Sequence, residues 1–264
     1  MQAPVKYEQA GSIVTLTLDR PELRNPISDP DMIGALEQAL ARIQADMSVS
    51  VAILTGNGSA FSSGGNLKQM GAVAAKRAPA DSRRYYDTGI QRIPRAFEAL
   101  EVPIIAAVNG PAFGAGCDLA CMCDLRIASE SAQFAESFVK LGIIPGDGGA
   151  WLLPRVVGYS KACEMAFTGD AINASDALAC GLVSQVVSDD ELLASAKALA
   201  QRIAVNPVHV LRMTKRLLQQ GRSASLEGVL QLSAAMQSIA HTTQDHVEAV
   251  EAMLQKRPPQ FTGQ

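Results

Sequence analysis

Short, mostly apolar runs that end beside glycines or other small residues recur along the chain, at residues 51–54, 104–108 and 125–128. Such compact runs are typical of strands that are buried on both faces, as in parallel sheets. Segments with the apolar spacing of helices lie between them, near residues 28–43 and 115–123. This alternation predicts an α/β core built from repeated strand–loop–helix units.

The start of the chain predicts a pair of strands ahead of these units. Val14, Leu16 and Leu18 recur at every second position, which is typical of a strand with one buried face. Residues 5–8 are expected to pair with this strand across a short turn. Proline and cap-type residues at 28–31 then predict the start of the first long helix.

The pattern changes after about residue 188. Residues 188–190 are expected to cap a helix, and no strand pattern follows residue 187. Helical spacing then continues at about residues 192–203, 208–220, 226–240 and 244–255. We therefore predict an α/β core at residues 1–188, which carries the functional site, and a helical oligomerisation region at residues 189–264.

Charge and composition exclude several functional classes. The 23 Lys and Arg residues against 26 Asp and Glu residues give a formal charge of −3, which does not fit a general nucleic-acid binder. The most apolar stretch, residues 102–123, is broken by prolines, glycines and Asp118, so no membrane span is expected. The first residues lack the apolar segment of a signal peptide, and the five cysteines are an odd number. These features predict a reduced protein in the cytoplasm.

Several familiar catalytic motifs do not fit this chain. Cys117, Cys121 and Cys123 lack the spacing and partners of a zinc site, so no metal is expected. The three histidines all fall in the predicted helical region, which argues against a Ser-His-Asp triad. No G-x-G-x-x-G sequence follows a strand as dinucleotide binding would require.

Two glycine-rich segments, residues 54–68 and 109–119, each follow a predicted buried strand and lead into a helix. Small residues there let a ligand approach the backbone closely. Helix N-termini leave unpaired N–H groups, and two of these that converge on one oxygen would form an oxyanion hole. The alternative interpretation is a pair of tight turns that pack a helix against a strand.

Seven longer segments of the sequence carry a resemblance to a known family. They are residues 18–25 (LDRPELRN), 61–68 (FSSGGNLK), 106–110 (AAVNG), 141–146 (LGIIPG), 153–155 (LPR), 167–170 (FTGD) and 255–261 (QKRPPQF). In these segments, and in their order along nearly the whole chain, the protein resembles the crotonase superfamily, which includes enoyl-CoA hydratases and isomerases. The resemblance implies a spiral of strand-strand-helix units with a C-terminal helical trimerisation region. It also implies an acyl-CoA thioester substrate, no cofactor apart from the coenzyme A of that substrate, and a homotrimer or homohexamer.

The resemblance also implies roles for individual residues. The N–H groups of Gly65 and Ala115 would form the oxyanion hole for the thioester oxygen. The residues expected to bind the substrate and its coenzyme A part are Leu23, Arg24, Ser63, Gly65, Asn66, Leu67, Lys68, Ala115 and Phe138, joined by Lys256 of a neighbouring subunit. For Arg24 and Lys68 the alternative is an ordinary solvated surface cation.

The sequence departs from the family where hydratases carry two glutamates that act as acid and base. The two positions are Asp118 and Phe138 in this chain. Aspartate is one methylene shorter than glutamate, and phenylalanine transfers no proton. Asp147 and Glu136 are the nearby carboxyl groups, and we expect Asp118 and Asp147 to form the working pair. The structural alternatives are a turn cap for Asp147, backbone hydrogen bonds for Asp118 and a purely structural Glu136.

The resemblance favours an enoyl-CoA hydratase. The alternatives are an enoyl-CoA or epoxyacyl-CoA isomerase that uses a single aspartate, and a crotonase-fold protein of low activity that binds acyl-CoA. Residues 71–88 are expected to form a mobile loop that runs into a helix, where Tyr85 and Tyr86 could line the acyl pocket. The identity of the acyl chain is left open.

Overall fold

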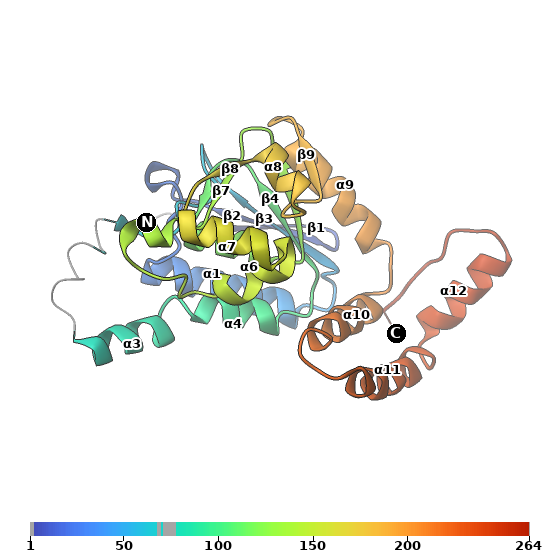
Figure 1. The fold of residues 1–264 in the computed structure, drawn as a ribbon. Helices are drawn as coiled ribbons and strands as arrows, with labels where there is room; N and C mark the ends of the chain where they lie inside the picture. The colour runs from blue at the N-terminus through green and yellow to red at the C-terminus, as the bar shows by residue number, and fades with distance from the viewer. Residues whose placement is uncertain (1–2, 68–69, 71–77, 264) are drawn as a thin grey trace.

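The computed structural model describes residues 3–67, 70 and 78–263. Its centre is a six-stranded sheet in the order β1-β2-β3-β4-β6-β9 (Figure 1). The strands are β1 (Val5–Ala10), β2 (Ile13–Leu18), β3 (Val51–Gly56), β4 (Ile104–Val108), β6 (Leu125–Ser129) and β9 (Gln185–Val187). The β1–β2 pair is antiparallel, and every other neighbouring pair in this sheet is parallel. The α/β class and the strand pair at the start of the chain are confirmed.

The central strands are buried on both faces, which explains their apolar sequences. Ala52 and Leu54 of β3 belong to the main hydrophobic core. Val51 and Ile53 belong to a second cluster on the opposite face, which α9 (Leu192–Ala204) covers. Since successive side chains of a strand point to opposite faces, both sets must be apolar.

A smaller three-stranded sheet lies beside the first, in the order β5 (Ala112–Phe113), β7 (Gln133–Ala135), β8 (Ile172–Asn173). The β5–β7 pair is parallel, with Phe113 opposite Ala135. Strands this short carry no detectable period, so the sequence did not predict them. Their pairing brings the end of β7 beside the start of the helix that follows β5.

The helices around the main core are α1 (Pro30–Ala45), α3 (Pro79–Thr88), α4 (Arg92–Ala99), α5 (Ala115–Met122), α6 (Gly149–Val157), α7 (Tyr159–Thr168) and α8 (Ala174–Ala179), with 3-10 turns η1 (Pro21–Leu23) and η2 (Ser137–Leu141). The helices expected near residues 28–43 and 115–123 are confirmed as α1 and α5, whereas α4, α6, α7 and α8 were not predicted. The helix expected before residue 88 is confirmed as α3. The loop expected ahead of it, residues 71–77, lies outside the described residues.

One predicted cap is wrong in its detail. The residue before α9 is Glu191, whose side chain makes no capping hydrogen bond. Asp189 accepts a hydrogen bond from the Ser131 backbone N–H at 3.1 Å instead. The Asp189 carboxylate therefore binds the turn between β6 and β7 and does not cap α9. Because α9 packs on the sheet, the region after residue 188 contributes to the core, and the division at 188/189 stays a prediction.

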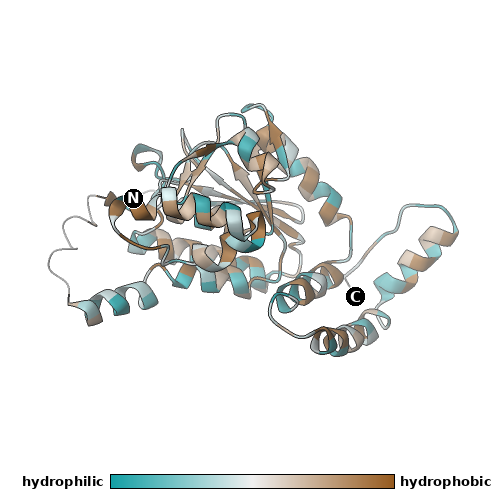
Figure 2. Cartoon of the chain, viewed as in Figure 1, coloured by the Kyte–Doolittle hydropathy of each residue, from teal (hydrophilic) through white to brown (hydrophobic). Residues whose placement is uncertain are grey.

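The remaining helices, α10 (Val208–Gln220), α11 (Leu226–Ala240) and α12 (Gln244–Leu254), extend away from the core (Figure 1). Two buried cations attach α10 to the core. Arg212 donates to the carbonyls of Gln44 and Asp46, each at 2.8 Å, and Lys215 forms an ion pair with Asp124 at 2.7 Å. Figure 2 shows apolar segments on α11 and α12, and α11 buries none of its residues. No helix in the described ranges is long and apolar enough to span a membrane.

Candidate active site

The two glycine-rich loops contact each other directly. Ser62 and Ala112 form a parallel bridge, and the Phe113 N–H donates to the Ser62 carbonyl at 3.0 Å. Gly64 has a φ of +77°, and a Cβ on it would lie 2.3 Å from the Phe113 oxygen and 2.9 Å from the Ala115 nitrogen. Only glycine fits at this junction, because it has no Cβ and it tolerates a positive φ.

The junction brings together the two expected oxyanion-hole donors. Ala115 is the first residue of α5, and the preceding Gly114 has a φ of +52°. The Gly114 N–H donates to the Ala135 carbonyl at 2.8 Å, which attaches the turn to the small sheet. Within the described ranges, no protein acceptor is bonded to the N–H of Gly65 or of Ala115. Both donors can therefore bind an oxygen of a ligand.

Three buried carboxyl groups meet below this junction. Asp118 comes from α5, Glu136 follows β7 and Asp147 precedes α6, and their exposed fractions are 0%, 2% and 4%. Glu136 and Asp147 both lie within hydrogen-bonding reach of the Asp118 side chain. A Cβ on Gly149 would lie 2.0 Å from Asp118 Oδ1, so glycine at the start of α6 leaves room for the Asp118 carboxyl group.

These three carboxyl groups can satisfy one another only if they share protons. When all three are ionised, both oxygens of Asp118, both of Glu136 and Oδ1 of Asp147 have no donor within the described structure. A proton on one group supplies the missing donor to its neighbour. Adjacent buried carboxylates cannot all keep their negative charge, so the cluster titrates as a unit.

The surroundings place the most tightly held proton on Asp118. Burial, followed by the charges of Glu136 and Asp147, raises the pKa of Asp118 well above its usual range. Burial also raises the pKa of Glu136 to about 7, although its hydrogen bond with Asp118 opposes the shift. Burial also raises the pKa of Asp147 above its usual range, although its hydrogen bond with Asp118 opposes part of this shift. These directions favour Asp118 as the group that holds its proton most tightly.

The positions of these residues bear on the alternatives left open for Asp118 and Glu136. It brings Asp118 and Asp147 together as expected, and Asp118 is not occupied by backbone N–H groups. Glu136 is a third member, which sequence reasoning had treated as mainly structural. The available signal was a glutamate placed directly after the buried residues Phe134 and Ala135. In the described part of the chain, no His, Cys, Asp and Glu side chains are grouped to hold a metal ion.

Several of the residues predicted to bind coenzyme A lie around the η1 corner and the first glycine-rich loop. The η1 corner with Leu23 and Arg24 lies against the first glycine-rich loop, because the Ser63 N–H donates to the Arg24 carbonyl at 2.8 Å. Asn66 donates through its N–H to Ser28 Oγ at 2.9 Å, and the neighbouring Leu67 is 60% exposed. Lys68 lies outside the described residues.

Two further predicted residues, Phe138 and Lys256, lie elsewhere, and one residue that was not predicted, Asn25, shapes the corner. Phe138 is buried beside Gly114, where a Cβ would lie 3.7 Å from its ring. Lys256 follows α12, at the end of the arm that α10–α12 form beside the core (Figure 1). Sequence reasoning did not single out Asn25, which is fully buried. Its side chain accepts from the Arg20 N–H and donates to the carbonyls of Asn57 and Ala60, which shapes the corner.

A groove of about 640 Å³ lies next to the carboxyl cluster. Its lining residues are Arg83, Tyr86, Asp87, Gln91, Gly142, Ile143, Ile144 and Gly146. The Tyr86 ring packs over Gly146, and burial together with the charge of Asp147 raises the pKa of Tyr86. Tyr86 therefore lines this groove, whereas Tyr85 packs edge-to-face on Tyr86 and is not among the lining residues.

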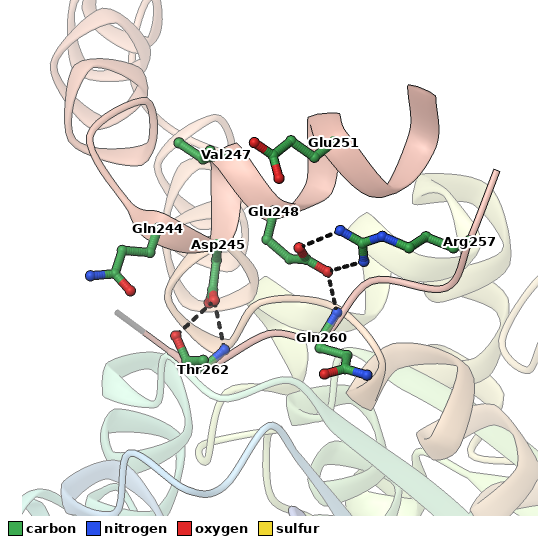
Figure 3. A pocket seen from close by; sticks show the side chains of 8 residues that line it. All are labelled: Gln244, Asp245, Val247, Glu248, Glu251, Arg257, Gln260 and Thr262. Atoms are coloured by element: carbon green, nitrogen blue, oxygen red, sulfur yellow. Dashed lines mark hydrogen bonds and ion pairs between the residues drawn. The ribbon is translucent and has the colours of Figure 1, made fainter. Parts of the chain in front are cut away.

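A second groove, between α12 and the C-terminal segment, has a volume of about 650 Å³ (Figure 3). Three of its charged groups, Asp245, Glu248 and Arg257, are already paired. Glu248 forms two hydrogen bonds with Arg257, at 2.6 and 2.8 Å, and Asp245 accepts from the Thr262 and Gly263 N–H groups. These bonds attach the C-terminal segment to α12, so we place the chemistry at the carboxyl cluster and not here.

Comparison with known proteins gives consistent matches along the chain. The model of the enoyl-CoA hydratase/isomerase family matches residues 8–264. The 1,2-epoxyphenylacetyl-CoA isomerase of Escherichia coli (strain K12) is 37% identical, covering 95% of each chain. The crotonyl-CoA hydratase of Syntrophomonas wolfei is 35% identical, covering 96% of each chain. The crystal structure of an enoyl-CoA hydratase from Bacillus anthracis is 32% identical with a TM-score of 0.92, covering 99% of this chain and 100% of that one.

Proposed function

Since the chain belongs to the enoyl-CoA hydratase/isomerase family, we propose that it is an enoyl-CoA hydratase, which adds water to the double bond of a 2-enoyl-CoA thioester. The expected crotonase-like fold is confirmed by its match to solved enoyl-CoA hydratases. The observation that carries the proposal is the junction of Gly64 with Ala115 beside buried carboxyl groups. Two backbone donors and a pair of acid and base groups are what hydration of a thioester enoyl group requires.

The proposed reaction assigns each group one task. The thioester oxygen accepts from the N–H groups of Gly65 and Ala115, which stabilise it as it gains enolate charge. Asp147 takes a proton from water, whose oxygen bonds to Cβ of the substrate. Asp118 gives its proton to Cα. Because Asp118 and Asp147 lie within hydrogen-bonding reach, the proton can return from Asp147 to Asp118 and restore the starting state.

The coenzyme A part would run from the carboxyl cluster toward the η1 corner. We assign its contacts to Leu23, Arg24, Ser63, Asn66, Leu67 and Lys68, with Phe138 beside the oxyanion loop and Lys256 supplied by a neighbouring subunit. The acyl chain would enter the groove lined by Tyr86 and Ile143, which lies next to Asp147. Coenzyme A enters as part of the substrate, and we assign no other cofactor. A cytoplasmic location stays a prediction.

A second candidate is an isomerase that moves a double bond or opens an epoxide of an acyl-CoA. Phe138 favours it, because a shift of one proton between two carbons needs only one carboxyl group. The 37% identity with the 1,2-epoxyphenylacetyl-CoA isomerase also supports it. The oxyanion hole would serve both reactions in the same way.

The two functions differ in a simple absorbance assay. We expect the purified protein to remove the absorbance of the conjugated thioester when a short 2-enoyl-CoA is added, because hydration saturates the double bond. A protein that acts only on a 3-enoyl-CoA, with a gain of this absorbance, would be an isomerase. If acyl-CoA binds and neither substrate reacts, the hydratase proposal is wrong, and a further assay with an epoxyacyl-CoA separates an epoxide isomerase from a binding protein.

We propose that α10–α12 bind further copies of the chain in a homotrimer or homohexamer. The arm exposes large apolar side chains that a lone chain would leave in water: Leu218, Leu226, Leu230, Ile239, Val247, Met253 and Leu254 are 52–81% exposed. Burial of such a surface is the main driving force for subunit association.

We expect light scattering of the wild type to give the mass of a trimer or hexamer, and the double variant Met253→Asp/Leu254→Asp to give a smaller mass. The control is Met47→Asp, which places a negative charge on an exposed methionine outside α10–α12 and should leave the mass unchanged. A monomeric wild type at micromolar concentration would contradict the assembly.

A further inference from the structure

We propose that Glu136 is a positioning residue that keeps Asp118 protonated, so that Asp118 enters the reaction as the acid and leaves Asp147 free to act as the base. This inference rests on the proposed function and extends it to a third carboxyl group. The acid and base pair described above does not include Glu136, yet its side chain is 2% exposed and lies against Asp118.

The position of Glu136 follows from the small sheet. The β5–β7 pairing sets Phe113 opposite Ala135, and the Gly114 N–H bonds to the Ala135 carbonyl. Glu136 is therefore the first residue past the point where β7 joins the start of α5. Its carboxyl group reaches Asp118 one turn into α5, whereas Asp147 reaches Asp118 from the turn before α6.

The groups that face this cluster carry no positive charge to neutralise it. From α5, Cys117 and Asp118 face Glu136, and the Cys117 thiol is also close to Cys121. Asp147 faces both carboxyl groups from the turn before α6, and Tyr86 of α3 faces Asp147. In the described ranges, no lysine or arginine bonds to Asp118, Glu136 or Asp147.

These contacts determine where the shared proton is held. Asp118 has two carboxyl neighbours, and a negative charge on either one disfavours a second charge on Asp118. A protonated Asp118 has a single O–H, which it can donate fully to one neighbour at a time. When Glu136 accepts that bond, both oxygens of Asp147 are left to receive a proton from water. Glu136 thus acts through Asp118 and needs no contact with the substrate.

The test is the pH profile of kcat in the variant Glu136→Gln. The amide removes one negative charge and can donate to an ionised Asp118, so both effects lower the pKa of Asp118. Activity that requires protonated Asp118 should then be lost at lower pH, and we expect the alkaline limb to move down by about one pH unit. Glu136→Asp, which restores the carboxyl group, should return the limb toward the wild-type position. Glu130→Gln, the same change at an exposed site, should not move it.

A wild-type alkaline limb in a folded Glu136→Gln variant would overturn the inference. A second measurement needs no turnover: infrared difference spectra of the free protein record the C=O band of protonated carboxyl groups during a pH titration. We expect that the band of Asp118, identified by its loss in Asp118→Asn, titrates at lower pH in Glu136→Gln. If it titrates so in a protein without hydratase activity, the proposed function fails and the proton sharing stands. If hydratase activity is present and the band does not move, the role of Glu136 is wrong.

Discussion

Replacing Asp118 with asparagine is expected to lower kcat by about 10²- to 10⁴-fold, which is the usual contribution of a positioned acid or base. The amide has nearly the shape of the carboxyl group but cannot give a proton to Cα and take it back. Asp147→Asn should lower kcat at least tenfold, because the proposed base is lost while its neighbour stays in place. Both values are obtained from initial rates with a saturating 2-enoyl-CoA.

The design separates lost chemistry from a lost fold. Asp118 is fully buried with a raised pKa, so its carboxyl group takes up a proton when the protein folds at neutral pH. An asparagine needs no such proton and should leave the thermal unfolding temperature unchanged or raise it. Asp190→Asn makes the same substitution at an exposed site and should keep wild-type kcat. Wild-type rates in folded Asp118→Asn and Asp147→Asn would remove the proposed acid and base pair.

The elements that the sequence predicts well are those with a long or fully buried pattern. Strands β3, β4 and β6 follow apolar runs, and helices α10 and α11 have the bounds expected from their spacing. The pattern succeeds because one local property, the period of the apolar side chains, determines which face is buried. The sequence also shows small residues directly after β3 and β4, and these segments form the two loops that meet in the structure.

What the sequence could not predict depends on contacts between distant residues. Strands β5 and β8 have two residues each, so their pairing follows from the packing of the whole chain and has no local signal. Glu136 joins the carboxyl cluster only through that pairing. Arg24 and Asn25 adopt a positive φ, which is rare for residues other than glycine, because the buried Asn25 side chain holds the corner closed.

The second large effect is expected from Gly64→Ala, at the junction of the two loops. The new methyl group would meet the Phe113 oxygen at 2.3 Å and the Ala115 nitrogen at 2.9 Å, so the loops must separate. Separation moves both proposed oxyanion-hole donors away from the thioester oxygen. Removing one such donor typically costs about 10²- to 10³-fold in kcat, and we expect a loss in this range when kcat is measured with 2-enoyl-CoA.

The control must place an alanine at a positive φ without the steric contact, and Gly158→Ala provides it. Gly158 has a φ of +80°, close to the +77° of Gly64, but no atom lies within 4 Å of the place its Cβ would take. Both variants should lose about 1–3 kcal/mol of stability, because alanine rarely adopts a positive φ. Gly64→Ala alone should lose activity, because it alone forces the loops apart. If both folded variants keep wild-type kcat, the Gly65 and Ala115 N–H groups do not hold the thioester oxygen, and the stabilisation of the enolate must come from other donors.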